Sequence, residues 1–268
     1  MRSAKNMRNH LHCPNPSHIA SNRDTIDRET VTGENSDVNA RVKPHPRFPG
    51  IFIATLEDGS QRLATENLSP GRTVYGERLL HHEKIEYRVW DAFRSKLAGA
   101  ILKGLEIIPI KPGNSVLYLG AASGTTASHV SDIVGAKGHV YCVEFASRSI
   151  RDLVDNVCPY RMNISPILED ARFPERYAMF IRGKVDEIYC DIAQPEQAKV
   201  LADNADFFLK DKGWIMLAVK SQSIDVTKEP AEVYEQELKV LVRRGFKIAQ
   251  LVHLEPYDRA HAMIVAQN

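Results

Sequence analysis

From residue 115 to the C-terminus, short apolar runs alternate with helical patterns of apolar positions. The apolar runs that indicate strands are 115–119, 139–145, 163–168, 185–191 and 214–220. Amphipathic patterns that indicate helices occupy 125–134, 148–157, 196–209 and 231–243. Strands that alternate with helices form a parallel sheet covered on both faces. We therefore predict an α/β fold with a doubly wound, mostly parallel sheet.

Two further strand patterns, at 247–254 and 262–267, close the chain with no helical pattern between them. A crossover between parallel neighbours needs about a dozen residues or more. The segment that joins these two strands is too short for one. We therefore expect the last strand to be antiparallel.

Residues 43–92 have a different pattern and predict a small β-rich N-terminal module. Its strand-like segments are 50–56, 61–65, 72–75 and 87–90. The first two flank Asp58-Gly59, a pair typical of a tight hairpin turn. An amphipathic helix at 95–105 then opens the main domain, which we predict to span 93–268.

The first 47 residues contain no Phe, Trp or Tyr and are rich in polar residues. Such a segment buries too little apolar area to offset chain entropy, so we predict that residues 1–42 form a disordered extension. It contains four side chains of metal-ligand type, His10, His12, Cys13 and His18. A metal site also needs supporting residues around its ligands. The segment offers none, and we expect no metal site.

Composition narrows the functional classes. The 268 residues include 35 Lys and Arg against 34 Asp and Glu, a formal net charge of +1. This balance argues against a free-standing polyanion binder, so any nucleic-acid contact needs a local basic patch or charge from partners. No apolar run approaches the ~18 residues of a membrane span, and no signal peptide is evident. The four Cys have no paired spacing, which suits the reducing cytoplasm.

Candidate chemistry lies at the carboxyl ends of the predicted strands, where sheets of this kind bind ligands. The first strand leads into Gly120-Ala-Ala-Ser-Gly-Thr-Thr126, and acidic residues end or follow the next three strands: Glu144, Asp170 and Asp191. The turn lacks the G-x-G-x-x-G spacing of a pyrophosphate site. Three carboxylates favour a cationic ligand without phosphate. S-adenosyl-L-methionine, which carries a sulfonium, an ammonium and a ribose, fits this description better than NAD.

Five segments resemble fibrillarin, the 2′-O-ribose methyltransferase of the box C/D ribonucleoprotein. They are VLYLGAASGTTASHVSDIV at 116–134, FRSKL at 93–97, DIAQP at 191–195, KSQSID at 220–225 and LEPY at 254–257. The resemblance covers about residues 43–268. The chain lacks the Gly/Arg-rich amino-terminal region of eukaryotic fibrillarin and therefore resembles the archaeal type. The resemblance implies a class I S-adenosyl-L-methionine-dependent methyltransferase fold.

The resemblance also implies a set of cofactor-binding residues: Gly120, Ala121, Gly124, Thr125, Thr126, Glu144, Phe145, Asp170, Ala171, Asp191, Ile192, Ala193 and Gln194. Glu144 would hold both ribose hydroxyls, and Asp170 would accept a hydrogen bond from the adenine amino group. Phe145 would stack on adenine. The alternative for Phe145 is an ordinary core aromatic.

A Lys-Asp-Lys-His catalytic set is implied at Lys96, Asp191, Lys220 and His261. Each has another interpretation: Lys96 as a solvated helix residue, Asp191 as a helix cap, and His261 as a loop histidine. A ribose hydroxyl attacks the sulfonium methyl only as its proton is withdrawn. We expect Lys220 to accept that proton, with Lys96 and His261 positioning the hydroxyl and the adjacent phosphate, although Lys96 remains open as the base.

The chain departs from the family pattern at two places. Ala260 stands where an acidic or amide residue usually precedes the histidine, which removes that neighbour as a hydrogen-bonding partner and leaves the role of His261 open. Asp91-Ala92 replaces the usual Asn-Pro before Phe93, for which we expect no functional consequence.

The family's activity implies RNA-guided methylation of rRNA and tRNA ribose as the catalytic subunit of a box C/D ribonucleoprotein. The implied partners are a Nop-domain scaffold protein, a kink-turn-binding ribosomal-type protein, a box C/D guide RNA and the rRNA and tRNA substrates, with no membrane, in the cytoplasm of an archaeal cell. Two alternatives are a methyltransferase for a protein side chain or small molecule, and a non-catalytic ribonucleoprotein subunit. Cofactor binding and guide-dependent transfer to RNA separate the three.

Overall fold

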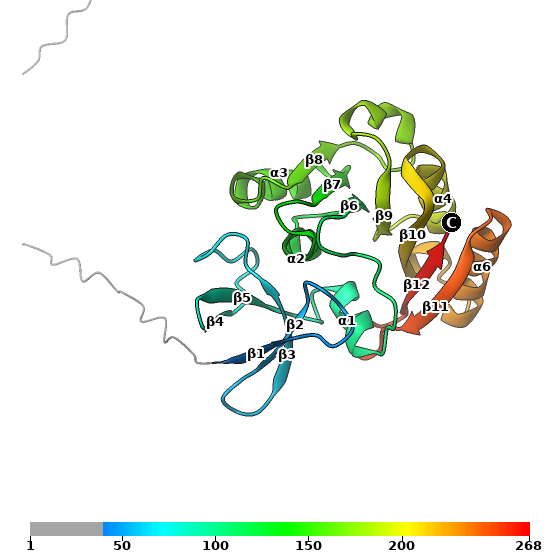
Figure 1. Cartoon of the computed structure of the whole chain (residues 1–268). Coiled ribbons are helices and arrows are strands. Elements are labelled where there is room, and N and C mark those ends of the chain that lie inside the picture. The colour runs from blue at the N-terminus through cyan, green and yellow to red at the C-terminus, as the bar shows by residue number, and fades with distance from the viewer. Residues whose placement is uncertain (1–39) are drawn as a thin grey trace, which may run out of the picture. The chain divides into compact units, whose positions relative to one another are not determined.

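A computed structural model describes residues 40–268, whose strands form two β-sheets (Figure 1). The first is an antiparallel sheet in the order β1-β2-β3-β5-β4. Its strands are β1 (Arg41–Pro44), β2 (Phe52–Thr55), β3 (Gln61–Glu66), β4 (Leu79–His82) and β5 (Ile85–Trp90). Residues 1–39 of the predicted disordered extension, with the four possible metal ligands, lie outside the described residues. The prediction was wrong at its end, because Arg41 and Val42 pair with β2 as part of β1.

The second sheet has seven strands in the order β11-β12-β10-β9-β6-β7-β8. They are β6 (Ser115–Leu119), β7 (His139–Glu144), β8 (Ile164–Leu168), β9 (Val185–Cys190), β10 (Leu209–Lys220), β11 (Lys247–His253) and β12 (His261–Gln267). The strands from β6 to β10 pair in parallel, whereas β12 is antiparallel to both β10 and β11. This confirms the predicted doubly wound sheet and its antiparallel last strand.

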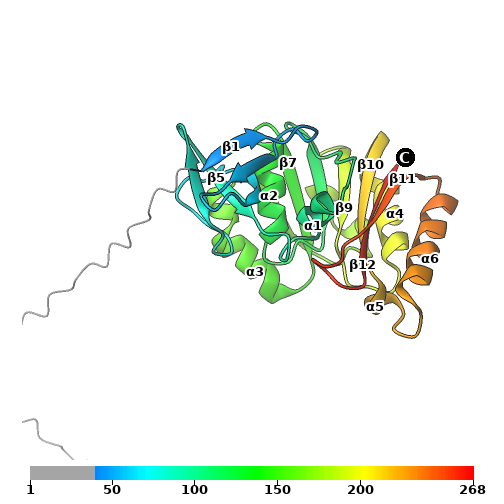
Figure 2. The same ribbon diagram turned by 90° about the horizontal axis from the view of Figure 1, so that it is seen from below.

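Helices cover the second sheet on both faces (Figure 2). They are α1 (Lys96–Leu102), α2 (Thr125–Val134), α3 (Ser147–Asn156), α4 (Gln197–Phe208), α5 (Ser221–Ile224) and α6 (Pro230–Arg243), with 3₁₀ turns at Cys158–Tyr160, Pro174–Arg176 and Ala178–Phe180. Val116 and Tyr118 pack toward α1, α2 and α3, whereas Leu117 and Leu119 pack toward α4 and α6. Successive side chains of a strand point to opposite faces of the sheet. Because both faces are covered by helices here, the central strands are apolar at nearly every position.

Within residues 40–268, no helix is long and apolar enough to cross a membrane. Cys142, Cys158 and Cys190 are free thiols, in line with their unpaired spacing.

One predicted strand is absent from the structure, two strands were not predicted, and β10 is longer than predicted. Residues 72–75 form a loop, because the N–H groups of Val74 and Tyr75 donate to the Glu77 carboxylate at 3.0 and 2.8 Å instead of to a neighbouring strand. The strands β1 and β4 were not predicted. Each is an edge strand with a single buried residue, so neither shows a clear alternation. β10 also begins at Leu209, earlier than the predicted Trp214.

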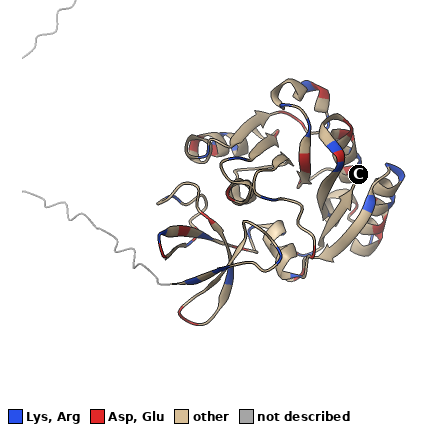
Figure 3. Cartoon of the chain, viewed as in Figure 1, with Lys and Arg blue, Asp and Glu red and all other residues tan. Residues whose placement is uncertain are grey.

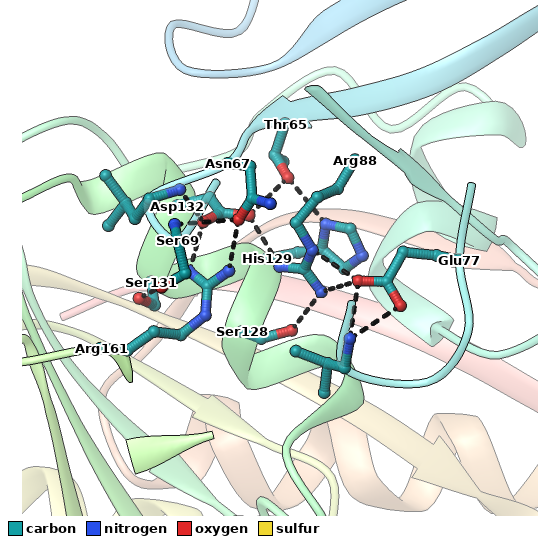
Figure 4. A network of polar contacts seen from close by, with 12 residues as sticks. Thr65, Asn67, Ser69, Glu77, Arg88, Ser128, His129, Ser131, Asp132 and Arg161 are labelled. Carbon is teal, nitrogen blue, oxygen red and sulfur yellow. Dashed lines mark hydrogen bonds and ion pairs between the residues drawn. The ribbon is translucent and has the colours of Figure 1, made fainter. Parts of the chain in front are cut away.

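A buried ionic network joins the small sheet to α2 (Figure 4). Arg88 of β5 donates to Asp132 of α2 at 2.8 Å and to Glu77 at 2.6 Å. Arg161 also contacts Asp132, and the Thr65 hydroxyl donates to the same carboxylate at 2.8 Å. The two arginines and two carboxylates therefore balance in charge, and every member is nearly inaccessible to solvent.

His129, one turn before Asp132 on α2, extends the network as a neutral group. Burial, with Arg88 and Arg161 nearby, lowers the pKa of His129 well below its ordinary value. The Thr65 hydroxyl donates to Asp132 and so accepts from His129 Nδ1 at 2.8 Å, which leaves Nε2 to accept from Tyr75 at 2.8 Å. The small sheet is thus fixed on α2 by a network whose polar groups are paired.

Replacing Asp132 with Asn should cost about 3–5 kcal/mol of unfolding free energy, because it leaves Arg88 and Arg161 buried with one carboxylate between them. Denaturant unfolding measures this loss. The control is Glu235→Gln, which removes a carboxylate from the exposed Glu235–Lys239 pair and should change stability little. Equal stability of the two variants would contradict the role given to the network.

Candidate active site

The turn after β6 packs directly against the end of β9. Gly120 has φ +81°, and a Cβ atom there would lie 2.5 Å from the carbonyl oxygen of Asp191. The Asp191 N–H also donates to the Leu119 carbonyl at 2.9 Å. Only glycine fits this close approach without displacing backbone. The turn predicted to hold a ligand and the predicted catalytic Asp191 are therefore in contact.

The same turn connects α2 to α1. Gly124 has φ +94° and precedes Thr125, where α2 begins without a side-chain cap on its N–H groups. The Thr126 hydroxyl donates to Ser95 Oγ at 3.0 Å. Ser95 Oγ in turn accepts from the Ala98 N–H at 3.4 Å and so caps α1. The Thr126–Ser95 hydrogen bond therefore holds the start of α1, where Lys96 lies, against the turn.

Glu144 and Phe145 lie at the end of β7, as predicted. Glu144 is 8% exposed, and its two carboxylate oxygens accept from the N–H groups of Ala122 and Ala146 at 2.9 and 2.8 Å. Each oxygen can accept a second hydrogen bond from a ligand. Phe145 is 62% exposed, so it is not the core aromatic of the alternative interpretation.

Asp170 lies after β8 and is bound by a neighbouring arginine. Arg172 Nη2 lies 2.6 Å from Asp170 Oδ2, and Arg172 Nε donates to Oδ1 at 3.1 Å. These hydrogen bonds lower the pKa of Asp170. The adjacent Ala171 is buried, and its carbonyl accepts from Asn204 at 2.8 Å. The sequence did not reveal the Arg172 contact, and a ligand at Asp170 must share the carboxylate with it.

Two predicted catalytic lysines meet at one carboxylate. Lys220 Nζ lies 3.1 Å and Lys96 Nζ 3.3 Å from Asp191 Oδ1. Lys220 ends β10, Lys96 begins α1 and Asp191 directly follows β9, and each side chain is less than one-fifth exposed. Lys96 is therefore not a solvated helix residue. Asp191 is not the cap of α4, whose N-cap is Glu196.

The fourth member of the predicted set, His261, joins the cluster through Asp258, which the sequence analysis missed. His261 Nδ1 lies 2.9 Å from Asp258 Oδ1, and Lys96 Nζ lies 3.5 Å from Asp258 Oδ2. Burial tends to raise the pKa of Asp258, but His261 and Lys96 outweigh it and hold that pKa below its usual value. Positive and negative groups thus alternate from Lys220 through Asp191 and Lys96 to Asp258.

The loop that carries Asp258 is pinned at Ala260, the position that departs from the family pattern. Ala260 has φ +56°, a left-handed conformation that is rare for alanine. Its carbonyl accepts from the N–H and hydroxyl of Ser221 at 3.2 and 2.9 Å. The residue immediately before His261 is thus an alanine held by its backbone, and the acidic partner of the histidine is Asp258, three residues before it.

Gln197, also missed from the sequence, holds two loops of the site together. The Lys220 N–H donates to Gln197 Oε1 at 2.9 Å, and Gln197 Nε2 donates to the Ile192 carbonyl. Gln197 is fully buried. On the same loop Ile192 is buried, Ala193 is exposed and Gln194 is half-buried. No cluster of three metal-ligating side chains exists among the described residues.

Comparison with known proteins shows that the chain is similar to the fibrillarins. The model of the Fibrillarin family matches residues 42–268. A fibrillarin-like rRNA/tRNA 2′-O-methyltransferase of Pyrobaculum calidifontis is 55% identical over 228 residues, which are 85% of this chain and 97% of the relative.

Two solved structures show the same fold. Aeropyrum pernix fibrillarin in complex with natively bound S-adenosyl-L-methionine is 55% identical, with a TM-score of 0.80 over 85% of this chain and 99% of that one. The fibrillarin chain of a fibrillarin/Nop5p complex is 44% identical, with a TM-score of 0.68 over 80% of this chain and 96% of that one.

Replacing Gly120 with Ala should destabilise the fold more than replacing Gly59 with Ala. Both glycines have positive φ, at +81° and +77°, but a Cβ at Gly59 meets nothing within 4 Å. The difference between the two variants in thermal unfolding therefore isolates the contact with Asp191 from backbone strain. Equal losses would show that the close approach does not constrain the turn.

Proposed function

The chain belongs to the fibrillarin family, and from this premise we propose that it is the S-adenosyl-L-methionine-dependent 2′-O-methyltransferase of a box C/D ribonucleoprotein, acting on rRNA and tRNA. The observation that carries the proposal is the contact between the Gly120 turn and Asp191. It joins a ligand-binding turn to a cluster of two lysines and a carboxylate.

The residues at the strand ends fit the cofactor. The turn at Gly120 has no room for a side chain, and Glu144 keeps hydrogen-bonding capacity for ribose hydroxyls. Phe145 offers an exposed ring to adenine, and Asp170 a carboxylate to its amino group. Around them, the remaining predicted cofactor-binding residues of the turn and of the 191–194 loop would complete the site. Once bound, the cofactor supplies a methyl group on an electrophilic sulfonium.

The chain's own residues then activate the ribose hydroxyl. Lys220 Nζ, in its amine form, accepts the hydroxyl proton, and Asp191 at 3.1 Å stabilises the ammonium that results. The Lys220 side chain is 19% exposed, so it can return the proton to solvent. Lys96 is held between Asp191 and Asp258 and positions the hydroxyl and its adjacent phosphate. Asp258 fixes the His261 ring beside them.

The partners follow from the same premise. A Nop-domain protein is the scaffold, as in the fibrillarin/Nop5p complex. A kink-turn-binding ribosomal-type protein and a box C/D guide RNA complete the proposed particle, which would act in the cytoplasm of an archaeal cell. Lys, Arg, Asp and Glu are interspersed along the chain (Figure 3), and the net charge is +1. This charge supports the proposal because the guide complex would supply most of the RNA affinity.

The assembled particle should methylate one ribose of a target RNA that is complementary to its guide, whereas the chain alone should transfer methyl groups to RNA poorly. The reason is the balanced charge, which is inadequate for tight RNA capture. The measurement is transfer of labelled methyl groups with the scaffold protein, kink-turn protein and guide RNA added or omitted. Equal, site-selective methylation by the lone chain, or methylation of protein instead of RNA, would contradict the proposal.

Lys220→Arg should reduce single-turnover methyl transfer in the particle by about 10²–10⁴, the usual cost of losing a general base. A guanidinium keeps the charge but does not give up its proton at accessible pH, so it cannot accept another. Lys210→Arg is the matched control, because Lys210 lies on the same strand but pairs with Asp186 on the surface. A near-normal rate for Lys220→Arg would assign proton removal to Lys96 or to solvent.

A further inference from the structure

A cleft of about 790 Å³ lies beside the charged cluster and has no role in the mechanism above. Its walls come from β3, from β5 and the loop before β4, from the segment that precedes α1, and from Leu102 at the end of α1, together with Tyr257. Three arginines line it: Arg62, Arg78 and Arg94. All three are exposed.

None of the three guanidinium groups forms an ion pair with a carboxylate within residues 40–268, although Arg62 is near enough to Asp58 to contribute to lowering the pKa of that carboxyl. Arg62 donates to the Gln61 carbonyl at 3.0 Å, Arg94 donates to the Tyr75 carbonyl at 3.4 Å, and no ion pair involves Arg78. Two acidic residues also line the cleft, but Glu77 is already bound by Arg88. Asp91 is the other, and it accepts a hydrogen bond from the Phe93 N–H at 2.9 Å. The cleft is therefore locally positive in a chain of nearly zero net charge.

The cleft leads to the residues that we place at the reacting ribose. Arg94 precedes Lys96 by two residues, and Tyr257 immediately precedes Asp258. Tyr257 also packs against α1 so closely that a Cβ on Gly99 would lie 3.2 Å from the tyrosine Cβ. Lys96 Nζ lies 3.5 Å from Asp258 Oδ2. A strand of RNA whose ribose is held at Lys96 thus has the arginine-lined cleft directly beside it.

We propose that this cleft binds the phosphodiester backbone of the target RNA strand next to the nucleotide that is methylated. The proposal rests on the proposed function. Arginine suits phosphate because its planar guanidinium donates two parallel hydrogen bonds. Contacts to phosphate position an RNA without reading its sequence, which is what an enzyme needs when a guide RNA selects the target.

The test neutralises the arginines in the complete particle. The full-length chain carries Arg62→Gln, Arg78→Gln and Arg94→Gln, singly and together, and is assembled with unchanged partners and guide. The KM for target RNA should rise at least about tenfold in the triple variant, while the single-turnover rate at saturating RNA stays within about twofold. Because each phosphate contact contributes about 0.7–0.9 to the slope of log affinity against log salt, that slope should flatten by about 2.

Arg243→Gln is the matched control, because it also removes one exposed positive charge. Arg243 is the last residue of α6, which covers the other face of the large sheet from α1, and no ion pair involves it among the described residues. This variant should keep the KM and the salt dependence of the unchanged particle. Thermal unfolding of each variant checks the fold, and the single variants carry the test if the triple variant is unstable.

Three other results of this experiment would contradict the cleft proposal, the proposed function or both. An unchanged KM and salt slope in a particle that methylates its target would overturn the cleft proposal and leave the proposed function standing. Loss of co-purification with the Nop-domain protein, at an unchanged KM once assembly is forced, would show a protein interface instead and also overturn the proposal. Absence of methylation by the unchanged particle would contradict the proposed function, and the cleft proposal with it.

Discussion

The contact between Gly120 and the Asp191 carbonyl is the constraint on which the site depends. It brings the carboxyl ends of the neighbouring strands β6 and β9 so close that no side chain fits between them. The turn of β6 is where the cofactor binds in our account, and the side chain of Asp191 is where Lys96 and Lys220 meet. In our account, the methyl donor therefore lies beside the charged cluster because β6 and β9 are neighbouring strands, and Lys220 reaches Asp191 from β10, the next strand of the sheet.

The small N-terminal sheet helps to hold the helices that flank the site in place. Its buried arginine, Arg88, is bound to Asp132 of α2, the helix that begins at the cofactor turn. The Thr126–Ser95 hydrogen bond then fixes α1, and with it Lys96, to the same helix. Buried ion pairs contribute little net stability compared with apolar packing, but they are intolerant of misplacement. We infer that this network matters chiefly because it holds α2 and α1 in one relative orientation.

The large sheet could be predicted well because its strands are buried on both faces and separated by helices. Runs such as 115–119 and 139–145 match the observed strands to within a residue. The edge strands β1 and β4 lack such a pattern, and Val74 and Tyr75 form a loop because the Glu77 carboxylate takes their N–H groups. Local patterns carry no information about such side-chain partners.

Side-chain partners also limit what the sequence could reveal about the site. The strand ends placed Glu144, Phe145 and Asp191 correctly because sequence position fixes which edge of the sheet they occupy. Asp258 and Gln197 were missed because each acts across loops that are distant in sequence. The contact of Arg172 with Asp170 was missed although the two are near in sequence, since nothing in the sequence shows which way an exposed arginine turns. An acidic residue three positions before His261 was the one available signal for Asp258.

In our account, one set of residues at the strand ends binds the cofactor, and the adjacent charged cluster moves the proton. Calorimetric affinity for S-adenosyl-L-methionine, compared between Glu144→Gln and Lys220→Arg, tests this account most directly. Hydrogen bonds to a charged group are worth about 1.5–3 kcal/mol, so Glu144→Gln should weaken binding at least about tenfold. Lys220→Arg should bind within about twofold of the unchanged protein. Undiminished binding by Glu144→Gln, or loss of binding by Lys220→Arg, would contradict the account.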